Sequence, residues 1–488
     1  MDIQLLTQLK SWNPWWDRGP TGMDAYRDPN YEREQYPSVK NQFLNSDQIV
    51  SIVGMRQVGK STMMRQIIRD LLNTNIDPKR ILYISFDDPF LRAHVNPKHL
   101  FENVIIEYTE NILRKDLRDA SEELYFFFDE VHQLPDWERA LKTYFDRRYP
   151  IRYMVSGSSS LHLKKKNRES LLGRISEHTL WPFSFREYVE YKATEEKNER
   201  LLKAAQDTRA VKDTFLRNFS LEETFQTAEP LFKELAIWEK QNIFNHLRTF
   251  TVVGGFPRVW QQPDLSSRQR TLWEQYVGKT LFEDLLQVAK IRRVKDLEFL
   301  FVRLLGFNGK ETTLSILQKD LKLSYVTFER YVSLFVTTFL LFRVERIKSE
   351  GIVRKRRASH VKFYVADPAL RNALYKKDES VFDDPEEMAF IAETLVCSTI
   401  ERWLSPMRGE DRIGYYSKNG EVDFVFKHGS GILPIEVKWR NDVPALKSLD
   451  NLVKKWKLKQ SMVVTKDFEL TYRNGRLSIP LWFFLMIF

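Results

Sequence analysis

Short apolar runs alternate with longer amphipathic stretches in the first part of the chain. The runs at 48–53, 124–130 and 151–158 have the length of buried strands, and residues 61–72 place apolar side chains at helical spacing. Strands that alternate with helices are typical of a parallel sheet with helices on both faces. We therefore predict an α/β fold, with a doubly wound parallel sheet, for residues 41–185.

The pattern changes after this region. Residues 186–306 are highly charged and helical in character, which predicts a helical lid or insertion. Residues 307–375 contain two helical patterns and then two strand patterns, at 314–321, 325–339, 341–347 and 361–366. Two helices joined by a short turn and followed by a two-stranded wing predict a winged helix.

The two ends of the chain have characters of their own. Residues 1–40 are rich in Trp, Tyr and Pro, and we expect an ordered aromatic extension that packs on the body of the protein or on a partner. Residues 376–488 begin with a helical pattern at 388–403 and continue in strands, which predicts a further α/β domain. The apolar run at 481–488 is too short to span a bilayer, so we expect a terminal strand inside a sheet.

The amino-acid composition favours one class of binding partner and one cellular compartment. The 488 residues carry a net charge of +10, which favours acidic partners and nucleic acid first. The single cysteine, Cys397, excludes an internal disulfide and a cysteine-rich metal site, and it fits a reducing, cytoplasmic setting. The first 20 residues contain no apolar signal segment, and we expect no membrane partner.

The segment 54–62 reads GMRQVGKST and fits the phosphate-loop pattern G-x-x-x-x-G-K-[S/T] between a strand and a helix. Glycines let the backbone N–H groups approach a phosphate chain, and the start of the helix adds its positive end. Lys60 is expected to reach the terminal phosphates, and the Ser61 hydroxyl to hold Mg²⁺. The predicted nucleotide contacts of this loop come from Gly54, Arg56, Gln57, Val58, Gly59, Lys60, Ser61 and Thr62.

A second signal follows about 70 residues after the phosphate loop. Here the apolar run LYFFFDE ends in two acidic residues, Asp129 and Glu130. The carboxyl end of a parallel strand is where an α/β sheet places its ligands. We expect Asp129 to hold Mg²⁺ through water and Glu130 to orient or deprotonate the attacking water. Ser156 and Ser158 end the next strand and either sense the γ-phosphate or belong to an ordinary turn.

The proposed wing carries a dense basic loop. Between Arg343 and Lys362 there are eight basic residues against two acidic ones, and the densest part is Arg354–Arg357. Contact with DNA phosphates is one interpretation, and a solvated loop is the other. The helical pattern at 325–339 is mostly apolar and aromatic, so sequence-specific recognition of bases is not expected. A winged helix can also serve as an interdomain or protein-binding module.

A second candidate site lies in the stretch EVDFVFKHGSGILPIEVK at 421–438. If Lys427 pairs with Ile432 across the turn, Asp423 comes to lie opposite Glu436. Two facing carboxylates repel unless a cation neutralises them, and Lys438 is placed to stabilise a hydroxide or phosphate beside them. This is the PD-(D/E)-x-K nuclease arrangement, in which Glu393 on the preceding helix is an additional acidic ligand.

The alternative for this stretch is a solvated hairpin with alternating charges. On the nuclease reading, Glu393, Asp423 and Glu436 are metal ligands, and Asp423, Glu436 and Lys438 are catalytic. The apolar side chains Val422, Phe424 and Phe426 are expected on one face of the first strand, and Ile435 and Val437 on one face of the second.

Taken together, the chain resembles a large prokaryotic family of AAA-superfamily ATPases with a P-loop domain, a winged helix and a C-terminal PD-(D/E)-x-K-like domain of unsettled function. The phrases that carry the resemblance are GMRQVGKST, FFFDEVHQLPDW, SGSSS, LLGR, WPFSFREY, GGFPR, VKFYVADPALR, EVDFVF and LPIEVK. The resemblance implies binding of ATP with Mg²⁺ and makes Arg174 the candidate trans-acting or sensor arginine. The alternative for Arg174 is an ordinary surface salt bridge. If Arg174 acts in trans, the protein is a homo-oligomer.

These observations predict a Mg²⁺-dependent ATPase coupled to DNA binding and, where the carboxylate site is active, to DNA cleavage. The competing interpretation is a nucleotide-controlled switch or scaffold whose degenerate nuclease-like domain only binds a partner. The predicted boundaries are 1–40, 41–185, 186–306, 307–375 and 376–488 for the extension, the ATPase core, the helical lid, the winged helix and the nuclease-like domain.

Overall fold

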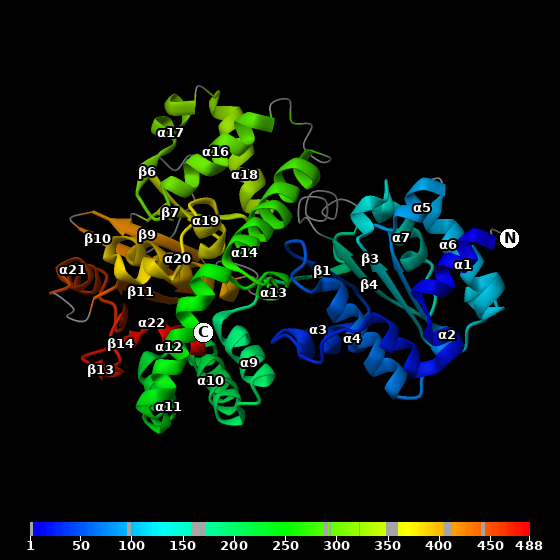
Figure 1. Cartoon of the computed structure of the whole chain (residues 1–488), viewed down its shortest axis with the longest axis horizontal. Coiled ribbons are helices and arrows are strands. Elements are labelled where there is room, and N and C mark those ends of the chain that lie inside the picture. Colours follow the sequence, from blue (N-terminus) through cyan, green and yellow to red (C-terminus); the bar gives the residue numbers. More distant parts are fainter. Residues whose placement is uncertain are drawn as a thin grey trace. The chain divides into compact units, whose positions relative to one another are not determined.

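The structure is a computed structural model that describes residues 3–94, 99–157, 171–286, 291, 294–321, 323–347, 360–404, 412–418, 420–440 and 445–488. The chain divides into two compact units, Met1–Leu180 and Trp181–Phe488 (Figure 1). The predicted boundary at 185 therefore lies close to the observed division. The boundaries predicted at 306 and 375 fall inside the second unit.

The first unit is built on a parallel sheet with strand order β2-β3-β4-β1-β5. Its strands are β1 (Ile49–Val53), β2 (Ile81–Ser85), β3 (Leu124–Asp129), β4 (Ile151–Gly157) and β5 (Ile175–Thr179). Every residue of β1, β2 and β3 is buried, as continuous apolar strands between two helical layers must be. The prediction of an α/β fold with a parallel sheet is confirmed, and three of the strands match predicted runs to within one residue at either end.

The helices of this unit lie between the strands and in the N-terminal extension. They are α1 (Ile3–Trp12), α2 (Trp15–Arg18), α3 (Tyr36–Asn45), α4 (Lys60–Asn73), α5 (Pro89–His94), α6 (Leu100–Tyr108) and α7 (Trp137–Asp146). The predicted helix at 61–72 is α4, whose apolar face is buried against the sheet.

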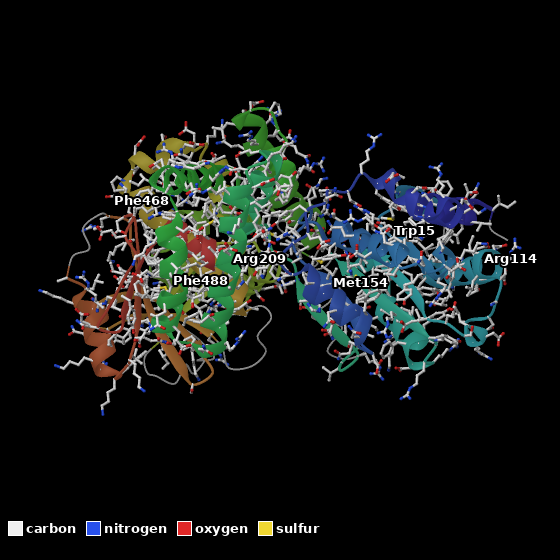
Figure 2. All side chains as sticks on the ribbon, turned by 90° about the horizontal axis from the view of Figure 1, so that it is seen from below. Trp15, Arg114, Met154, Arg209, Phe468 and Phe488 are labelled. Carbon is white, nitrogen blue, oxygen red and sulfur yellow. The ribbon has the colours of Figure 1, made fainter. Side chains whose placement is uncertain are left out.

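The N-terminal extension packs on the edge strand β2, which is the first of the two alternatives left by the sequence. The Asn13 side chain accepts a hydrogen bond from the Tyr83 amide at 2.7 Å and donates one to the Tyr83 carbonyl at 2.8 Å. Trp15, labelled in Figure 2, and Trp16 both donate from their indole nitrogens to the Ile81 carbonyl. Side chains thus satisfy backbone groups that an edge strand otherwise exposes.

The second unit contains a mixed sheet with strand order β13-β14-β12-β11-β10-β9-β7-β8-β6. Its strands are β6 (Thr312–Thr313), β7 (Leu341–Arg346), β8 (His360–Val365), β9 (Arg412–Ser417), β10 (Glu421–His428), β11 (Gly431–Lys438), β12 (Ser461–Thr465), β13 (Thr471–Arg473) and β14 (Arg476–Pro480). Because β7 pairs with β9, the strands of the predicted wing and those of the C-terminal domain form one continuous sheet.

The helices of the second unit surround this sheet and form a helical region before it (Figure 1). They are α9 (Phe185–Glu195), α10 (Glu199–Asn218), α11 (Leu221–Glu234), α12 (Ile237–Val253), α13 (Pro257–Trp260), α14 (Leu265–Thr271), α16 (Val294–Gly306), α17 (Leu314–Leu321), α18 (Tyr325–Thr337), α19 (Pro368–Leu374), α20 (Pro385–Leu404), α21 (Lys447–Lys455) and α22 (Leu481–Ile487). In the described parts of the chain, no helix combines the length and the apolar character that crossing a bilayer requires.

The prediction of a terminal strand at 481–488 is wrong, because the run forms helix α22. All of its side chains are buried, so it has no polar face to set a period. Donors from three other helices reach its last carbonyls: Arg186 contacts Ile487, Thr208 contacts Met486 and Trp403 contacts Phe488. These contacts satisfy backbone acceptors that a buried helix end would otherwise leave unpaired.

Candidate nucleotide-binding site and a buried carboxylate cluster

The predicted phosphate loop joins the end of β1 to the start of α4. Gly54 is required at the first position, because a Cβ there would lie 2.2 Å from the carbonyl oxygen of Leu180. Gln57 and Gly59 have positive φ angles of 58° and 104°, a conformation that turns successive N–H groups toward one point. The loop therefore forms an anion-binding concavity at the positive end of α4.

Lys60, the first residue of α4, is held inside this loop. Its side chain is 3% exposed, and the ammonium donates to the carbonyl of Met55 at 2.9 Å. The carboxylate of Glu130 lies 3.8 Å away. An ammonium group held on backbone carbonyls beside a concave loop can turn toward a phosphate chain without leaving the site.

Asp129 and Glu130 lie at the carboxyl end of β3, next to the end of β4. Asp129 is buried and accepts hydrogen bonds from the hydroxyls of Ser156 and Tyr83, the latter at 3.0 Å. Burial, followed by the charge of Asp129, raises the pKa of Tyr83 well above its ordinary value, so the phenol keeps its proton and donates. The carboxylate of Asp129 is thus fixed in one orientation.

Glu130 is held by its backbone and by a neighbouring imidazole. The Glu130 amide donates to Ser156 Oγ at 3.0 Å, and the Glu130 backbone adopts a left-handed conformation with φ of 51°. His132 Nδ1 lies 3.2 Å from the Glu130 carboxylate. The serine therefore connects both acidic residues and fixes their spacing at the end of the sheet.

The N-terminal extension braces the same site. Arg33, which is buried, donates to the carbonyl of Val58 in the phosphate loop at 2.9 Å. Asp28 accepts two hydrogen bonds from Arg65 of α4, at 2.6 and 2.7 Å, and Arg65 also donates to the hydroxyl of Tyr83 at 3.3 Å. A chain of contacts therefore runs from the extension through Tyr83 to Asp129.

These residues fit a nucleoside triphosphate with Mg²⁺. The loop supplies backbone donors and one ammonium, which suit phosphate, and Asp129 together with the Ser61 hydroxyl supplies the oxygen ligands that Mg²⁺ prefers. Lys60, Asp129 and Glu130 all border the same end of the sheet, and Arg56, Val58 and Thr62 belong to the loop and the first turn of α4.

The structure bears differently on the other residues predicted for this site, Arg174, Ser156 and Ser158. Arg174 precedes β5 and pairs with Asp146 through contacts of 2.7 and 3.3 Å, while its side chain is 34% exposed. Its role toward phosphate stays a prediction. Ser158 lies outside the described residues, whereas Ser156, for which the sequence left two alternatives open, contacts both acidic residues.

The second candidate site is the hairpin of β10 and β11. Lys427 pairs with Ile432, as predicted, and the pairing continues to Phe424 and Ile435. One further step places Asp423 beside Glu436, and the amide of Val437 donates to Asp423 Oδ2 at 2.8 Å. Both carboxylates are buried.

The predicted grouping of apolar side chains on β10 is wrong at one position. Val422 belongs to the core cluster that contains Val425, Leu449 and Leu452, and so does not pack with Phe424. A break in the pairing of β10 with β9 between residues 422 and 425 explains the change, because an extra residue on one strand reverses the alternation.

Glu393 and two lysines complete the cluster around Asp423 and Glu436. Glu393 on α20 accepts a hydrogen bond from the hydroxyl of Tyr364 at 2.9 Å. Lys438 contacts Glu436 at 2.5 Å. Lys362 on β8 lies 4.0 Å from Asp423 and 3.8 Å from Glu393. We name Glu393, Asp423, Glu436, Lys362 and Lys438 the carboxylate cluster.

Burial controls the charges in this cluster. Desolvation, and then the charge of Asp423, raise the pKa of Glu393 to about 8 and that of Glu436 to about 7. Burial alone would lower the pKa of Lys438, but Asp423 and Glu436 raise it above its ordinary value. Desolvation would likewise lower the pKa of Lys362, but Glu393, Asp423 and Glu421 raise it above its ordinary value. Both lysines are therefore charged at neutral pH.

Three of the eight basic residues between Arg343 and Lys362 are engaged by acidic side chains of the second unit. Arg343 pairs with Glu329 at 2.9 Å, and Arg346 lies 3.6 Å from Glu311. Lys362 is buried in the carboxylate cluster. The densest segment, Arg354–Arg357, lies outside the described residues.

Comparisons with known proteins bear on each part of the chain. Residues 46–189 match a family model described as an AAA domain. The chain contains an AAA-type P-loop ATPase domain. Residues 244–381 and 388–484 match two models described as domains of unknown function, DUF8612 and DUF4143. The match to the AAA domain model covers the phosphate loop and both acidic residues described above.

Two curated relatives cover most of the chain. An uncharacterized protein of Methanocaldococcus jannaschii is 22% identical over 428 residues, which is 84% of this chain and 80% of that protein. An uncharacterized protein of Haemophilus influenzae is 22% identical over 456 residues, which is 91% of this chain and 95% of that protein. Each alignment thus covers at least 80% of this chain and of the relative, and neither relative's name assigns an activity.

Two solved structures show looser likenesses. The Walker-type ATPase of Pyrococcus abyssi aligns with a TM-score of 0.41 and 17% identity, over 71% of this chain and 96% of that one. The Drosophila ORC bound to DNA aligns with a TM-score of 0.29 and 11% identity, over 72% of this chain and 98% of that one.

At both sites, the sequence did not predict the residues that contact and position the predicted site residues. Tyr83 and Arg33 contact the AAA site from an edge strand and from the extension, and neither belongs to a motif. Lys362 carried a readable signal, because it is a single lysine within the otherwise apolar or aromatic strand VKFYVA. A charged residue in such a strand indicates a buried ion pair.

Proposed function

We propose that this protein binds ATP with Mg²⁺ and hydrolyses it in the AAA domain. The observation that carries the proposal is the arrangement of Lys60, Asp129 and Glu130 at one end of a parallel sheet, with both acids held by Ser156. Bound Mg²⁺ would neutralise phosphate charge as the terminal phosphoryl group is transferred.

The roles of the residues follow from their positions. The loop amides and Lys60 bind and orient the phosphates, while Ser61 and Asp129 hold the cation. Glu130 orients the attacking water or accepts its proton. Its backbone is fixed by the hydrogen bond to Ser156 and its carboxylate lies 3.2 Å from His132 Nδ1, so the group is positioned before the nucleotide arrives.

The test is ATP hydrolysis by the purified full-length chain, with two variants that separate binding from turnover. Lys60→Ala is expected to abolish turnover, and Glu130→Gln is expected to retain ATP binding and lose hydrolysis. Binding is measured with a fluorescent ATP analogue, and folding of each variant by circular dichroism. Full hydrolysis by either folded variant would defeat the proposal.

We extend the proposal to DNA for the second unit. The elements α16, α17 and α18 followed by the antiparallel strands β7 and β8 support a winged helix. Its DNA contacts would come from Arg354–Arg357 and would fall mainly on phosphates. Measuring the ATP turnover rate with and without double-stranded DNA tests whether DNA binding is coupled to hydrolysis. An unchanged rate would contradict this coupling.

The order of elements at the C-terminus supports a nuclease-like fold. Helix α20 is followed by the meander β9, β10 and β11, and then by α21 and the strand β12, which runs parallel to β11. The D…E-x-K residues lie on β10 and β11 within this order. Cleavage requires in addition that the carboxylate cluster accept a metal ion.

A further inference from the structure

Lys362 brings a positive charge into the carboxylate cluster from outside the hairpin. It lies on β8, and its side chain is 1% exposed. Its ammonium is 2.5 Å from Glu421, 3.8 Å from Glu393 and 4.0 Å from Asp423. The ring of Tyr415 lies 5.4 Å from the same nitrogen. The ammonium is therefore enclosed by acids from β10 and α20 and by one aromatic face.

A buried ammonium is stable only where carboxylates compensate it. Conversely, the buried acids of this cluster can stay ionised only where a cation compensates them. Lys438 contacts Glu436, and Lys362 contacts the other carboxylates, so each acid already has a lysine partner. A divalent ion at this place would meet the repulsion of an ammonium that approaches the same carboxylates to within 4 Å.

Two observations concern the metal directly. In the parts of the chain that the structure describes, no group of three or more His, Cys, Asp or Glu is arranged to hold a metal ion. One carboxylate oxygen, Glu436 Oε2, is nevertheless buried without a hydrogen-bond partner. The cluster thus keeps an acceptor for a cation, while its charges are already balanced by lysines.

We infer that Lys362 takes the place of the divalent cation in this nuclease-like arrangement. The C-terminal domain then binds neither Mg²⁺ nor Mn²⁺ at the carboxylate cluster and cleaves no phosphodiester. Lys362 instead ties β8 of the wing to β10 of the C-terminal sheet. This role of Lys362 concerns only the second unit and is independent of ATP hydrolysis.

The experiment measures Mn²⁺ binding to the nucleotide-free, full-length protein by electron paramagnetic resonance of free Mn²⁺. The natural chain is expected to show no Mn²⁺ site that depends on Asp423. Lys362→Met removes the ammonium and keeps most of the length of the side chain. This variant is expected to gain one Mn²⁺ site with an affinity at least tenfold above any Mn²⁺ binding by the natural chain. Lys362→Met combined with Asp423→Asn is expected to lose that gain.

The control is Lys447→Met, which removes the same charge from an exposed lysine and should leave Mn²⁺ binding unchanged. One equivalent of Mn²⁺ bound by the natural chain and lost in Asp423→Asn would overturn the inference. A folded Lys362→Met variant that binds no better than the natural chain would also overturn it. If Lys362→Met does not fold, the comparison of the natural chain with Asp423→Asn still decides.

Discussion

Asp367 accepts a hydrogen bond from the amide of Gly255 at 2.9 Å, although 112 positions separate the two residues. The other oxygen of Asp367 accepts from the amide of Ala369 and so begins helix α19. Gly255 lies close to Phe183, whose carbonyl oxygen would be 2.2 Å from an added Cβ. The segments GGFPR (254–258) and VADPALR (365–371) are therefore joined at the buried carboxylate of Asp367.

This relationship predicts a large stability effect at Asp367. Asp367→Ala leaves two buried amides without partners, so the free energy of unfolding should fall by about 3 kcal/mol. Urea denaturation followed by circular dichroism measures the change. Asp378→Ala removes a cap at an exposed position and should have a clearly smaller effect. Equal effects of the two substitutions would contradict the structural role of the buried pair.

A second prediction concerns the brace between the extension and the phosphate loop. Arg33 holds the Val58 carbonyl, so Arg33→Ala should raise the KM for ATP about tenfold while kcat changes little. Arg33→Lys should recover part of the loss, because an ammonium can still donate to the carbonyl. The control is Arg69→Ala, which removes an exposed contact to Asn30 in the same segment. A fall in kcat with no change in KM would contradict the positioning role.

A third prediction separates the two interpretations of Arg174. If the residue serves the transferred phosphoryl group, Arg174→Ala should reduce kcat at least about a hundredfold, whereas Asp146→Ala should not. If the salt bridge is the whole role, both substitutions should have the same small effect. We expect the first pattern. Mixing Arg174→Ala with Lys60→Ala protein then tests action in trans, since mixed assemblies should regain activity.

A fourth prediction concerns the wing. Replacing Arg354, Lys355, Arg356 and Arg357 by Ala should weaken DNA binding for all sequences alike. It should also flatten the salt dependence of the affinity, by roughly one slope unit for each phosphate that the wing no longer neutralises. Arg343→Ala and Arg346→Ala are matched controls that should change neither quantity, because these two residues are engaged with Glu329 and Glu311. Titrations by fluorescence anisotropy at several salt concentrations measure both.

A fifth prediction follows from the pKa of Glu393. Its pKa in the folded chain is raised from 4.5 to about 8, so the folded state binds more protons than the unfolded state between these values. Stability should therefore fall as the pH rises from about 4.5 to about 8. Glu393→Gln cannot lose a proton and should remove a loss on the order of 4 kcal/mol from this range.

The measurement for this prediction is urea denaturation of both proteins at several pH values. The difference between them reports the titration of Glu393 together with that of the acids coupled to it, Asp423 above all. A difference that does not change with pH would show that the carboxyl group has an ordinary pKa in the folded chain.

Much of the fold was determined by local sequence. The phosphate loop was readable because the small size of Gly54 and the positive φ of Gly59, together with the flanking strand and helix, are needed within a few residues of one another. The pairing of Lys427 with Ile432 was predictable because a slip of one residue would expose an apolar face. The winged-helix and nuclease-like assignments, read from the same kind of local pattern, stay predictions.

Tertiary structure alone decided the points where sequence reasoning failed. The run at 481–488 is apolar at every position, so its helix was set by donors from α9, α10 and α20 and not by any period in the sequence. Lys362 belonged by sequence to a basic loop, yet it is buried among acids that lie up to 61 residues further along the chain. Periodicity is a property of neighbouring residues, whereas the neutralisation of a buried charge depends on which distant residues the fold brings within 4 Å.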